Sequence, residues 1–390
     1  MQRVVWINKS NWRKPGPIVY MGLLNALAFA ENGLVTDFFV GSDKDSDTEA
    51  DLTGFYGLKS HQCLNIHRVP DTAGWRRSVY KAAVAKIALY CEQGDEVLAL
   101  TRELGVLGLL LKLRKKYPKL KVIYETHDYY LSIRHLDKKK FSISSIRRQW
   151  TERILIPKAD GLICLTEYQR ALYQQWFPKL AIIALSLGCL DFPQQPLVEQ
   201  RRLKRCVAYI GHLHSYKGLE LIFELAGHLR TVNIELHSFG GNAAQVLSLQ
   251  ERAEKEGLTG VLHFSPFIEP RVLHEILDND ISIGLVPLQD TFYSRYLTCP
   301  VKALDFIAHG LPTIASEIPS ARAVLREAGF YCDSKNVTEF VDKAIALLAD
   351  ADSYLSATKA SYSRSGELQW RLRAKRILEF VEGISQHKSL

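Results

Sequence analysis

Short apolar runs suited to buried strands alternate with amphipathic helical segments along almost the whole chain. This alternation is typical of parallel α/β layers and excludes an all-helical or an all-β fold. The predicted strands form two series, one over residues 4–8, 35–41, 65–69, 96–100, 121–125, 162–165 and 182–186, the other over 206–211, 233–240, 261–264, 281–287, 312–316 and 330–333.

A Pro-rich polar segment separates the two series, as expected of an interdomain linker. The length of 390 residues, 47% of them hydrophobic, is sufficient for two sizeable cores. We therefore predict an N-terminal domain over 1–190, a linker over 191–204, a C-terminal domain over 205–366 and a final helix over 367–390.

Composition excludes several structural features and indicates the charge of the binding partner. The seven cysteines form no Cys-x-x-Cys pair, which argues against a disulfide framework or a structural zinc site. No apolar run approaches the roughly 20 residues of a membrane helix, and the start of the chain leads directly into a strand, so we expect a cytoplasmic protein. The net charge of +8 indicates an anionic partner, either a nucleoside diphosphate, an anionic lipid surface or nucleic acid. We find no nucleic-acid recognition motif and expect no such partner.

One acidic residue, Asp305, lies among apolar neighbours in a helical segment that ends at Gly310 and precedes a predicted strand. A carboxylate in such surroundings needs a partner, because burying an unpaired charge is costly. A ligand rich in hydroxyl groups would satisfy it, so we predict a sugar or ribose site.

Two loops that follow predicted strands carry groups suited to phosphate. The segment from Gly211 to Gly218 opens a helix, so its backbone N–H groups and Lys217 are placed to meet phosphate oxygens. The alternative is a solvated lysine at a helix start. Gly240 and Gly241 form a second glycine turn at the end of a strand, which is a weak signal on its own.

In the first half of the chain, His127 directly follows the predicted strand 121–125. Ligand sites in open parallel sheets lie beyond the carboxyl ends of the strands, so His127 is a candidate site residue, although a lone histidine also serves structural roles. The loop after the first strand contains Gly16 and Pro17, where the backbone can approach a ligand and a helix can begin. An ordinary turn is an equal alternative there.

The acidic run Asp278-Asn279-Asp280 has a spacing that suits Mg²⁺ or Mn²⁺. It lies where a predicted helix ends before the strand 281–287, so we interpret it as a helix-terminating segment and expect no bound metal.

In their order along the chain, these segments resemble retaining glycosyltransferases of the GT-B fold, in particular glycosyltransferase family 4 (group 1). The resemblance implies two Rossmann-like domains facing across a cleft, with a C-terminal helix that crosses back to the first domain. It implies no cofactor other than the donor substrate. Two departures from the family pattern are Leu297, where the first of two Glu residues stands, and His212, where an Arg is usual.

The resemblance also assigns roles. His127 would position the sugar, Lys217 would neutralise the leaving diphosphate, and Asp305 would hold the ribose. The donor-binding residues that it implies are Gly16, Gly211, His212, Lys217, Gly240, Gly241, Thr298, Cys299, Pro300, Val301, Lys302 and Asp305.

The implied reaction is metal-independent transfer of a hexose from a nucleoside diphosphate sugar to a saccharide or glycolipid acceptor, with retention of anomeric configuration, in the synthesis of a bacterial surface polysaccharide or glycolipid. Two alternatives remain open, a nucleotide-sugar epimerase of the same fold and a non-catalytic nucleotide-sugar-binding protein. The basic stretch 134–153, which contains Trp150, is either a solvated helix face or a surface for peripheral attachment to the inner face of an anionic membrane.

Overall fold

The computed structural model describes residues 2–14, 16–43, 48–70, 77–132, 143–194, 197–213 and 219–387. The chain forms two compact units. The first comprises Met1–Leu187 and Trp370–Leu390, and the second comprises Gly188–Gln369. Each unit contains one sheet, and within the described residues all the strand pairs are parallel.

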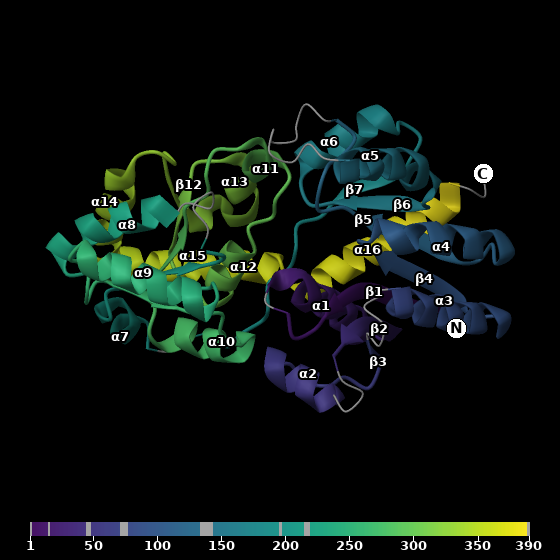
Figure 1. Cartoon of the computed structure of the whole chain (residues 1–390), viewed down its shortest axis with the longest axis horizontal. Helices are drawn as coiled ribbons and strands as arrows, with labels where there is room; N and C mark the ends of the chain where they lie inside the picture. The colour runs from purple at the N-terminus through teal and green to yellow at the C-terminus, as the bar shows by residue number, and fades with distance from the viewer. Residues whose placement is uncertain are drawn as a thin grey trace. The chain divides into compact units, whose positions relative to one another are not determined.

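The first unit is a seven-stranded sheet in the order β3-β2-β1-β4-β5-β6-β7 (Figure 1). The interior strand β1 is apolar and fully buried at Val4, Val5 and Ile7, as expected of a parallel strand covered on both faces. Its elements are β1 (Gln2–Asn11), α1 (Pro17–Glu31), β2 (Val35–Ser42), α2 (Glu49–Tyr56), β3 (Leu64–Pro70), α3 (Arg77–Glu92), β4 (Glu96–Thr101), α4 (Leu104–Lys116), β5 (Lys121–Glu125), α5 (Ile143–Leu155), β6 (Gly161–Cys164), α6 (Glu167–Trp176), β7 (Ile182–Ala184) and α16 (Trp370–His387).

The last helix, α16, belongs to the first unit although it follows the second along the chain. It packs against α1, and its apolar side Trp370, Ala374, Ile377 and Val381 is buried. In Figure 1 it is the yellow helix among the purple and blue elements of that unit. This packing brings the side chain of Arg373 into the interior of the first unit.

The second unit is a six-stranded sheet in the order β10-β9-β8-β11-β12-β13. Several of its helices begin at residues whose side chains cap the first turn, such as Asn242 before α9 and Asn336 before α14. Its elements are α7 (Val198–Leu203), β8 (Cys206–Ile210), α8 (Leu219–Leu229), β9 (Glu235–Phe239), α9 (Ala243–Lys255), β10 (Leu262–Ser265), α10 (Pro270–Asn279), β11 (Ile283–Val286), α11 (Phe292–Tyr296), α12 (Val301–Ala308), β12 (Thr313–Ser316), α13 (Pro319–Leu325), β13 (Gly329–Cys332), α14 (Val337–Ala349) and α15 (Ala351–Glu367).

The predicted α/β architecture is confirmed. Every strand predicted from the sequence is present, and its ends differ from the prediction by no more than about three residues. The segment 191–204, predicted as a linker, contains α7. Arg201 of this helix is buried and donates hydrogen bonds to the carbonyl oxygens of His309 and Gly310, which satisfies the end of α12.

Candidate functional site

In the first unit the strand order reverses between β1 and β4, because β2 and β3 lie on one side and β5 to β7 on the other. The carboxyl ends of strands at such a switch point are where open parallel sheets bind ligands. At this point Nζ of Lys9 lies 2.5 Å from the Glu103 carboxylate, and the hydroxyl of Tyr80 donates to the same group at 2.7 Å. Glu103 is buried, so these contacts compensate its charge.

Gly16 lies in the loop that connects β1 to α1. Its φ of +118° is in the region that favours glycine, and a Cβ added there would meet no atom within 4 Å. The helix that it precedes has no side-chain cap and no acidic residue in its first turn. Within the described residues, no side chain fills the space beside Gly16 or caps this end of α1, and its role in ligand binding stays a prediction.

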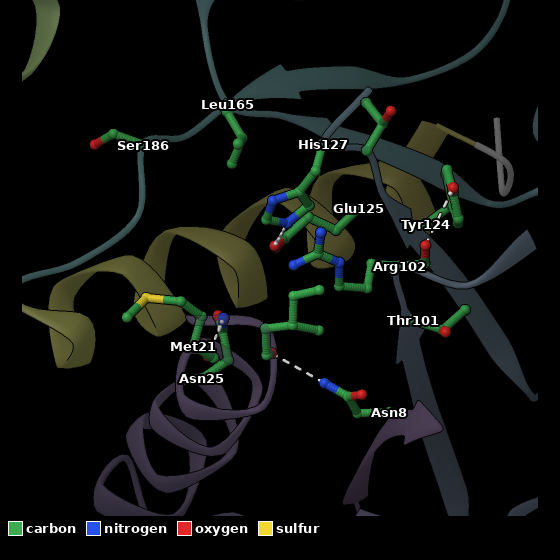
Figure 2. A network of polar contacts seen from close by, with 12 residues as sticks. Asn8, Met21, Asn25, Thr101, Arg102, Tyr124, Glu125, His127, Leu165 and Ser186 are labelled. Carbon is green, nitrogen blue, oxygen red and sulfur yellow. Dashed lines mark hydrogen bonds and ion pairs between the residues drawn. The ribbon is translucent and has the colours of Figure 1, made fainter. Parts of the chain in front are cut away.

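Next to β4, strand β5 ends in a network of buried charges that centres on Glu125. One carboxylate oxygen of Glu125 lies 2.7 Å from Nε2 of His127, and the other accepts a hydrogen bond from Arg373 at 2.7 Å. Arg373 also donates to the side chain of Asn25 in α1 and to the carbonyl of Ser186. Figure 2 shows Glu125 and His127 with Asn25 and Arg102 around them.

The electrostatics of this network fix the form of His127. Burial would raise the pKa of Glu125, but Arg373 and His127 overcome it and hold that pKa well below its usual range. Burial, helped by Arg102, lowers the pKa of His127 despite the neighbouring carboxylate. A neutral His127 beside an ionised Glu125 must donate from Nε2, because the carboxylate only accepts. Its Nδ1 is then an acceptor, suited to the hydroxyl of a sugar.

A second buried acid, Glu152 of α5, lies near the same loop. It accepts hydrogen bonds from the backbone N–H of Tyr130 at 3.0 Å and from the hydroxyl of Tyr173 at 3.2 Å. Burial raises its pKa to about 8, so it is mostly protonated at neutral pH. Tyr173 also contacts Thr126, which links Glu152 to the segment that carries His127.

In the second unit the strand order reverses between β8 and β11. The loops after β8 and β9 meet there, and a Cβ added at Gly240 would lie 2.0 Å from the carbonyl oxygen of Gly211. Both glycines have positive φ, of +142° and +151°, so this contact of two backbones requires glycine. The N–H of Gly211 donates to the carbonyl of Phe239 at 2.9 Å, which joins the two loops.

Lys302, in the first turn of α12, reaches the same place. Its Nζ lies 3.7 Å from the centre of the Tyr209 ring and 3.2 Å from the position of a Cβ on Gly211. The helix has no side-chain cap at Pro300 and no acidic residue in its first turn. A lysine, glycine loops and a helix N-terminus at one sheet edge form an environment suited to phosphate.

Asp305 lies one turn further along α12 and is partly buried. Within the described ranges its carboxylate has no hydrogen-bond or ion-pair partner, and burial raises its pKa to about 7. A carboxylate in this state is stabilised by any ligand that supplies hydroxyl donors. That a sugar or ribose hydroxyl supplies this partner to Asp305 stays a prediction.

The remaining predicted donor residues precede or begin α12. Leu297 is buried at 4% exposure, in the position where the family pattern has its first Glu. Cys299 and Pro300 are buried, and Thr298 and Val301 are partly buried. A Cβ added at Gly241 would lie 3.1 Å from the side chain of Leu213, so the loop after β9 passes beside the residue that follows His212. Lys217 lies outside the described residues.

The structure thus brings together Gly211, Gly240 and Lys302 in the second unit, while His127 and Gly16 lie in the first. The acidic run Asp278-Asn279-Asp280, predicted to end a helix, lies at the end of α10. Asp278 accepts a hydrogen bond from His309 at 2.7 Å, and Asp280 lies 3.3 Å from Nζ of Lys204.

Sequence reasoning missed several residues around these sites. Arg373 is 248 positions from Glu125, and nothing local to either residue signals their pairing. Glu152 was not singled out because it lies in the basic stretch 134–153, which was interpreted as a solvated helix face or a membrane-attachment surface. Of these residues, only Glu103 could have been predicted from the sequence. It follows a predicted strand, so it is expected at the same sheet edge as His127.

Comparison with known proteins shows what the second half of the chain resembles. Residues 204–350 match the family model described as glycosyl transferases group 1. A curated relative, an uncharacterized glycosyltransferase of Haemophilus influenzae, is 22% identical over 254 residues, which are 59% of this chain and 65% of the relative. The match therefore spans slightly less than two thirds of that relative's length.

Solved structures extend the similarity of fold to the whole chain. Sucrose-phosphate synthase from Thermosynechococcus elongatus has a TM-score of 0.70 at 15% identity and covers 99% of both chains. HepE of Anabaena, in complex with UDP and glucose, has a TM-score of 0.67 at 14% identity and covers 98% of this chain and 100% of its own. A mutant of S. aureus TarM bound to UDP has a TM-score of 0.70 at 10% identity, covering 97% of this chain and 99% of its own. The chain has the two-domain GT-B fold of these glycosyltransferases, and the predicted resemblance to the group 1 type is confirmed.

Proposed function

We propose that the protein is a retaining hexosyltransferase that moves a sugar from a nucleoside diphosphate sugar to a saccharide or glycolipid acceptor without a catalytic metal. The observation that carries the proposal is the meeting of Lys302 with the Gly211 and Gly240 loops at the switch point of the second sheet. This edge lies inside the part of the chain that matches the group 1 family model.

The second unit would bind the donor. Lys302 and the N-terminus of α12 would face the diphosphate, with Lys217 as a further cation, and Asp305 would accept hydrogen bonds from the ribose hydroxyls. Negative charge develops on the diphosphate as its bond to the sugar breaks. Fixed cations and backbone N–H groups stabilise that charge more than they stabilise the bound substrate, which is what lowers the barrier.

The first unit would orient the sugar and the acceptor. Nδ1 of neutral His127 would accept a hydrogen bond from a sugar hydroxyl, while Glu125 and Arg373 keep the ring in one tautomer and orientation. Gly16 and the open N-terminus of α1 would let the backbone approach the substrate. We assign no residue as a covalent nucleophile.

A turnover assay with purified protein tests the proposal. UDP-glucose is the first donor to try, because HepE was crystallised with UDP-glucose and TarM with UDP; GDP-, ADP- and TDP-glucose follow, each with and without a panel of saccharide and lipid-linked acceptors. We expect release of nucleoside diphosphate that depends on acceptor, an unchanged rate in EDTA, and a product whose anomeric configuration matches the donor by NMR.

Other outcomes of the same assay contradict the proposal. Conversion of the donor sugar without acceptor would support an epimerase. Binding of nucleotide without turnover of any donor would support a non-catalytic binding protein, which Leu297 in place of the family's Glu brings into consideration. Inversion of the anomeric centre would remove the retaining mechanism and leave the transferase activity.

We further propose that α5 attaches the protein to an anionic membrane surface, where a lipid-linked acceptor would be met. Residues 143, 147, 150 and 154 recur on one side of this helix, and Ile143, Trp150 and Ile154 are 87%, 58% and 50% exposed beside the exposed Arg147. Apolar side chains next to arginine suit the interface of an anionic bilayer. Residues 134–142 of the basic stretch lie outside the described part of the chain.

The described helices include none with the length and apolar character needed to span a bilayer. Flotation with vesicles rich in phosphatidylglycerol tests surface attachment. We expect binding that weakens with salt and with Trp150→Ala, but not with Leu247→Ala, which removes a similarly exposed apolar side chain (59%) from α9 of the second unit. Equal binding by both variants would exclude α5 as the attachment surface.

A further inference from the structure

Two histidines and one glutamate converge on the first residues of β9 and the adjacent edge strand β10. Glu235 and His237 are two positions apart on β9, so their side chains point to the same face of the sheet. His263 of β10 is paired directly with His237 in the parallel register. The sheet geometry itself therefore places the three side chains side by side.

The distances between their ligand atoms are close to those around a small metal ion. Oε2 of Glu235 lies 3.1 Å from Nε2 of His237 and 3.2 Å from Nε2 of His263, and all three atoms lie within 4.8 Å of one another. In a tetrahedral site with metal–ligand bonds of about 2.0–2.1 Å, ligand atoms are about 3.3 Å apart. Two edges of the triangle already fit, and a small movement of one imidazole closes the third.

The atom Nε2 of His263 points to a missing ligand. It is buried, yet in the described structure it makes no hydrogen bond, because the carboxylate at 3.2 Å lies outside its bonding direction. A buried imidazole nitrogen without a hydrogen-bond partner loses free energy that a metal ion would restore. The three side chains are otherwise 31% to 51% exposed, so an ion can reach them and water can complete its coordination.

We propose that Glu235, His237 and His263 bind one divalent transition-metal ion. Among these ions, Zn²⁺ suits the three side chains best. Two imidazoles and one carboxylate are the ligand set of Zn²⁺ and its first-row neighbours, whereas Mg²⁺ and Ca²⁺ prefer oxygen ligands only. The site is separate from the donor edge, because Glu235 begins β9 while Gly240 follows its end. It would tie the edge strand β10 to β9.

Calorimetric titration of the tag-free, EDTA-treated protein with ZnCl₂ tests this assignment. We expect one equivalent to bind, with affinity at least tenfold lower in His263→Ala and in Glu235→Gln and unchanged in His228→Ala, which removes an exposed histidine of α8. Saturating Zn²⁺ should raise the Tm of the wild type by about 3–5 °C and leave that of His263→Ala unchanged, and MgCl₂ should do neither.

X-ray absorption at the zinc edge identifies the ligands independently of stability. We expect a first shell of nitrogen and oxygen only, at about 2.0 Å, without the sulfur at about 2.3 Å that one of the seven free cysteines would give. The proposal is overturned if the wild type binds no equivalent of Zn²⁺, if His263→Ala and Glu235→Gln bind it as the wild type does, or if sulfur is in the first shell.

Discussion

The candidate sites of the two units each contain a carboxylate whose pKa is shifted by its surroundings, but the two pKa values are shifted in opposite directions. Glu125 in the first unit is held by Arg373 and His127, which lower its pKa well below the usual range. Asp305 in the second unit has no partner in the described structure, and burial raises its pKa to about 7.

This difference separates a site that the protein completes by itself from one that a ligand must complete. The network of Glu125 exists before substrate arrives, so it can fix the orientation of His127 at no further cost during binding. On the proposed function, the carboxylate of Asp305 would gain its hydrogen-bond partners from the ribose hydroxyls of the donor, and its protonation state would then change when the donor binds. The predictions below test this contrast.

The largest expected effect is on the network of the first unit. Arg373→Met leaves the buried Glu125 without its main counter-charge, and breaking a buried ion pair from one side costs about 3–5 kcal/mol of unfolding free energy. Urea denaturation followed by circular dichroism measures the loss. Arg376→Ala, on the exposed side of the same helix, should change stability by less than about 0.5 kcal/mol.

The double variant Arg373→Met with Glu125→Gln sharpens this test. Because the Gln side chain is neutral, it needs no counter-charge, and we expect the double variant to be more stable than Arg373→Met alone. If the two losses simply add, the side chains do not stabilise each other, and the contrast with Asp305 loses its physical basis.

The next effect concerns the cation of the second unit and rests on the proposed function. Lys302→Ala removes a fixed positive charge from the diphosphate, so kcat/KM should fall by roughly a hundredfold. Lys359→Ala, an exposed lysine of α15, is the matched control and should keep the wild-type rate. A Lys302→Ala variant with wild-type turnover would place the leaving group elsewhere.

A smaller effect is expected from Asp305, and its sign follows from the raised pKa. A carboxylate with a pKa of 3.8 when unfolded and about 7 when folded favours folding fully below pH 4, and this contribution is lost as the pH rises through 7. The ligand-free protein should therefore be less stable at pH 8 than at pH 5. Full burial would give about 2.7 kcal/mol for the roughly two pH units between 5 and the folded pKa, and we halve this value because the side chain is partly exposed. Asp305→Asn should therefore remove about 1.4 kcal/mol of that difference.

Nucleotide binding should act on Asp305 in the opposite direction. Ribose hydroxyls that donate to the ionised carboxylate lower its pKa, so affinity for the nucleoside diphosphate should increase between pH 6 and pH 8. Calorimetry at both values measures this change, and Asp305→Asn should abolish it. A change in affinity that persists in Asp305→Asn would show that another group titrates.

The strands were predicted well from the sequence, for a physical reason. Strands of a parallel sheet are buried on both faces, so they appear as continuous apolar runs, and the residues just after them must lie at one edge. Gly211 and Gly240 each come directly after a strand and follow this rule, whereas Lys302 lies in a helix and was predicted only through the family resemblance.

The partners of Glu125 do not follow any local rule. Arg373 reaches it from a helix at the other end of the chain, and this pairing depends on how α16 packs against α1. The cluster of Glu235, His237 and His263 shows the same limit at shorter range. The spacing of Glu235 and His237 is visible in the sequence, but His263 joins them only because β10 has this register with β9.

Substitution of Glu152 is expected to change stability least, and it is the most direct control for the comparison of Glu125 with Asp305. It is as deeply buried as Glu125, with 1% exposure for each, but its described contacts are hydrogen bonds from Tyr130 and Tyr173 and not an ion pair. Its pKa of about 8 means that it already folds as a neutral acid at pH 7, and this contribution to stability is present below about pH 4.5 and lost as the pH rises through 8.

Glu152→Gln should therefore change the unfolding free energy at pH 7 by less than about 1 kcal/mol, because one neutral side chain replaces another and the hydroxyl of Tyr173 can accept from the amide. Glu125→Gln alone should cost more, since it leaves the buried Arg373 without its counter-charge. Urea denaturation of both variants at pH 7 and pH 9 measures the difference, and the Glu152→Gln variant should become the more stable protein relative to wild type at the higher pH. Equal losses for the two substitutions at pH 7 would mean that burial alone, and not the presence of a counter-charge, decides how this fold holds its acids.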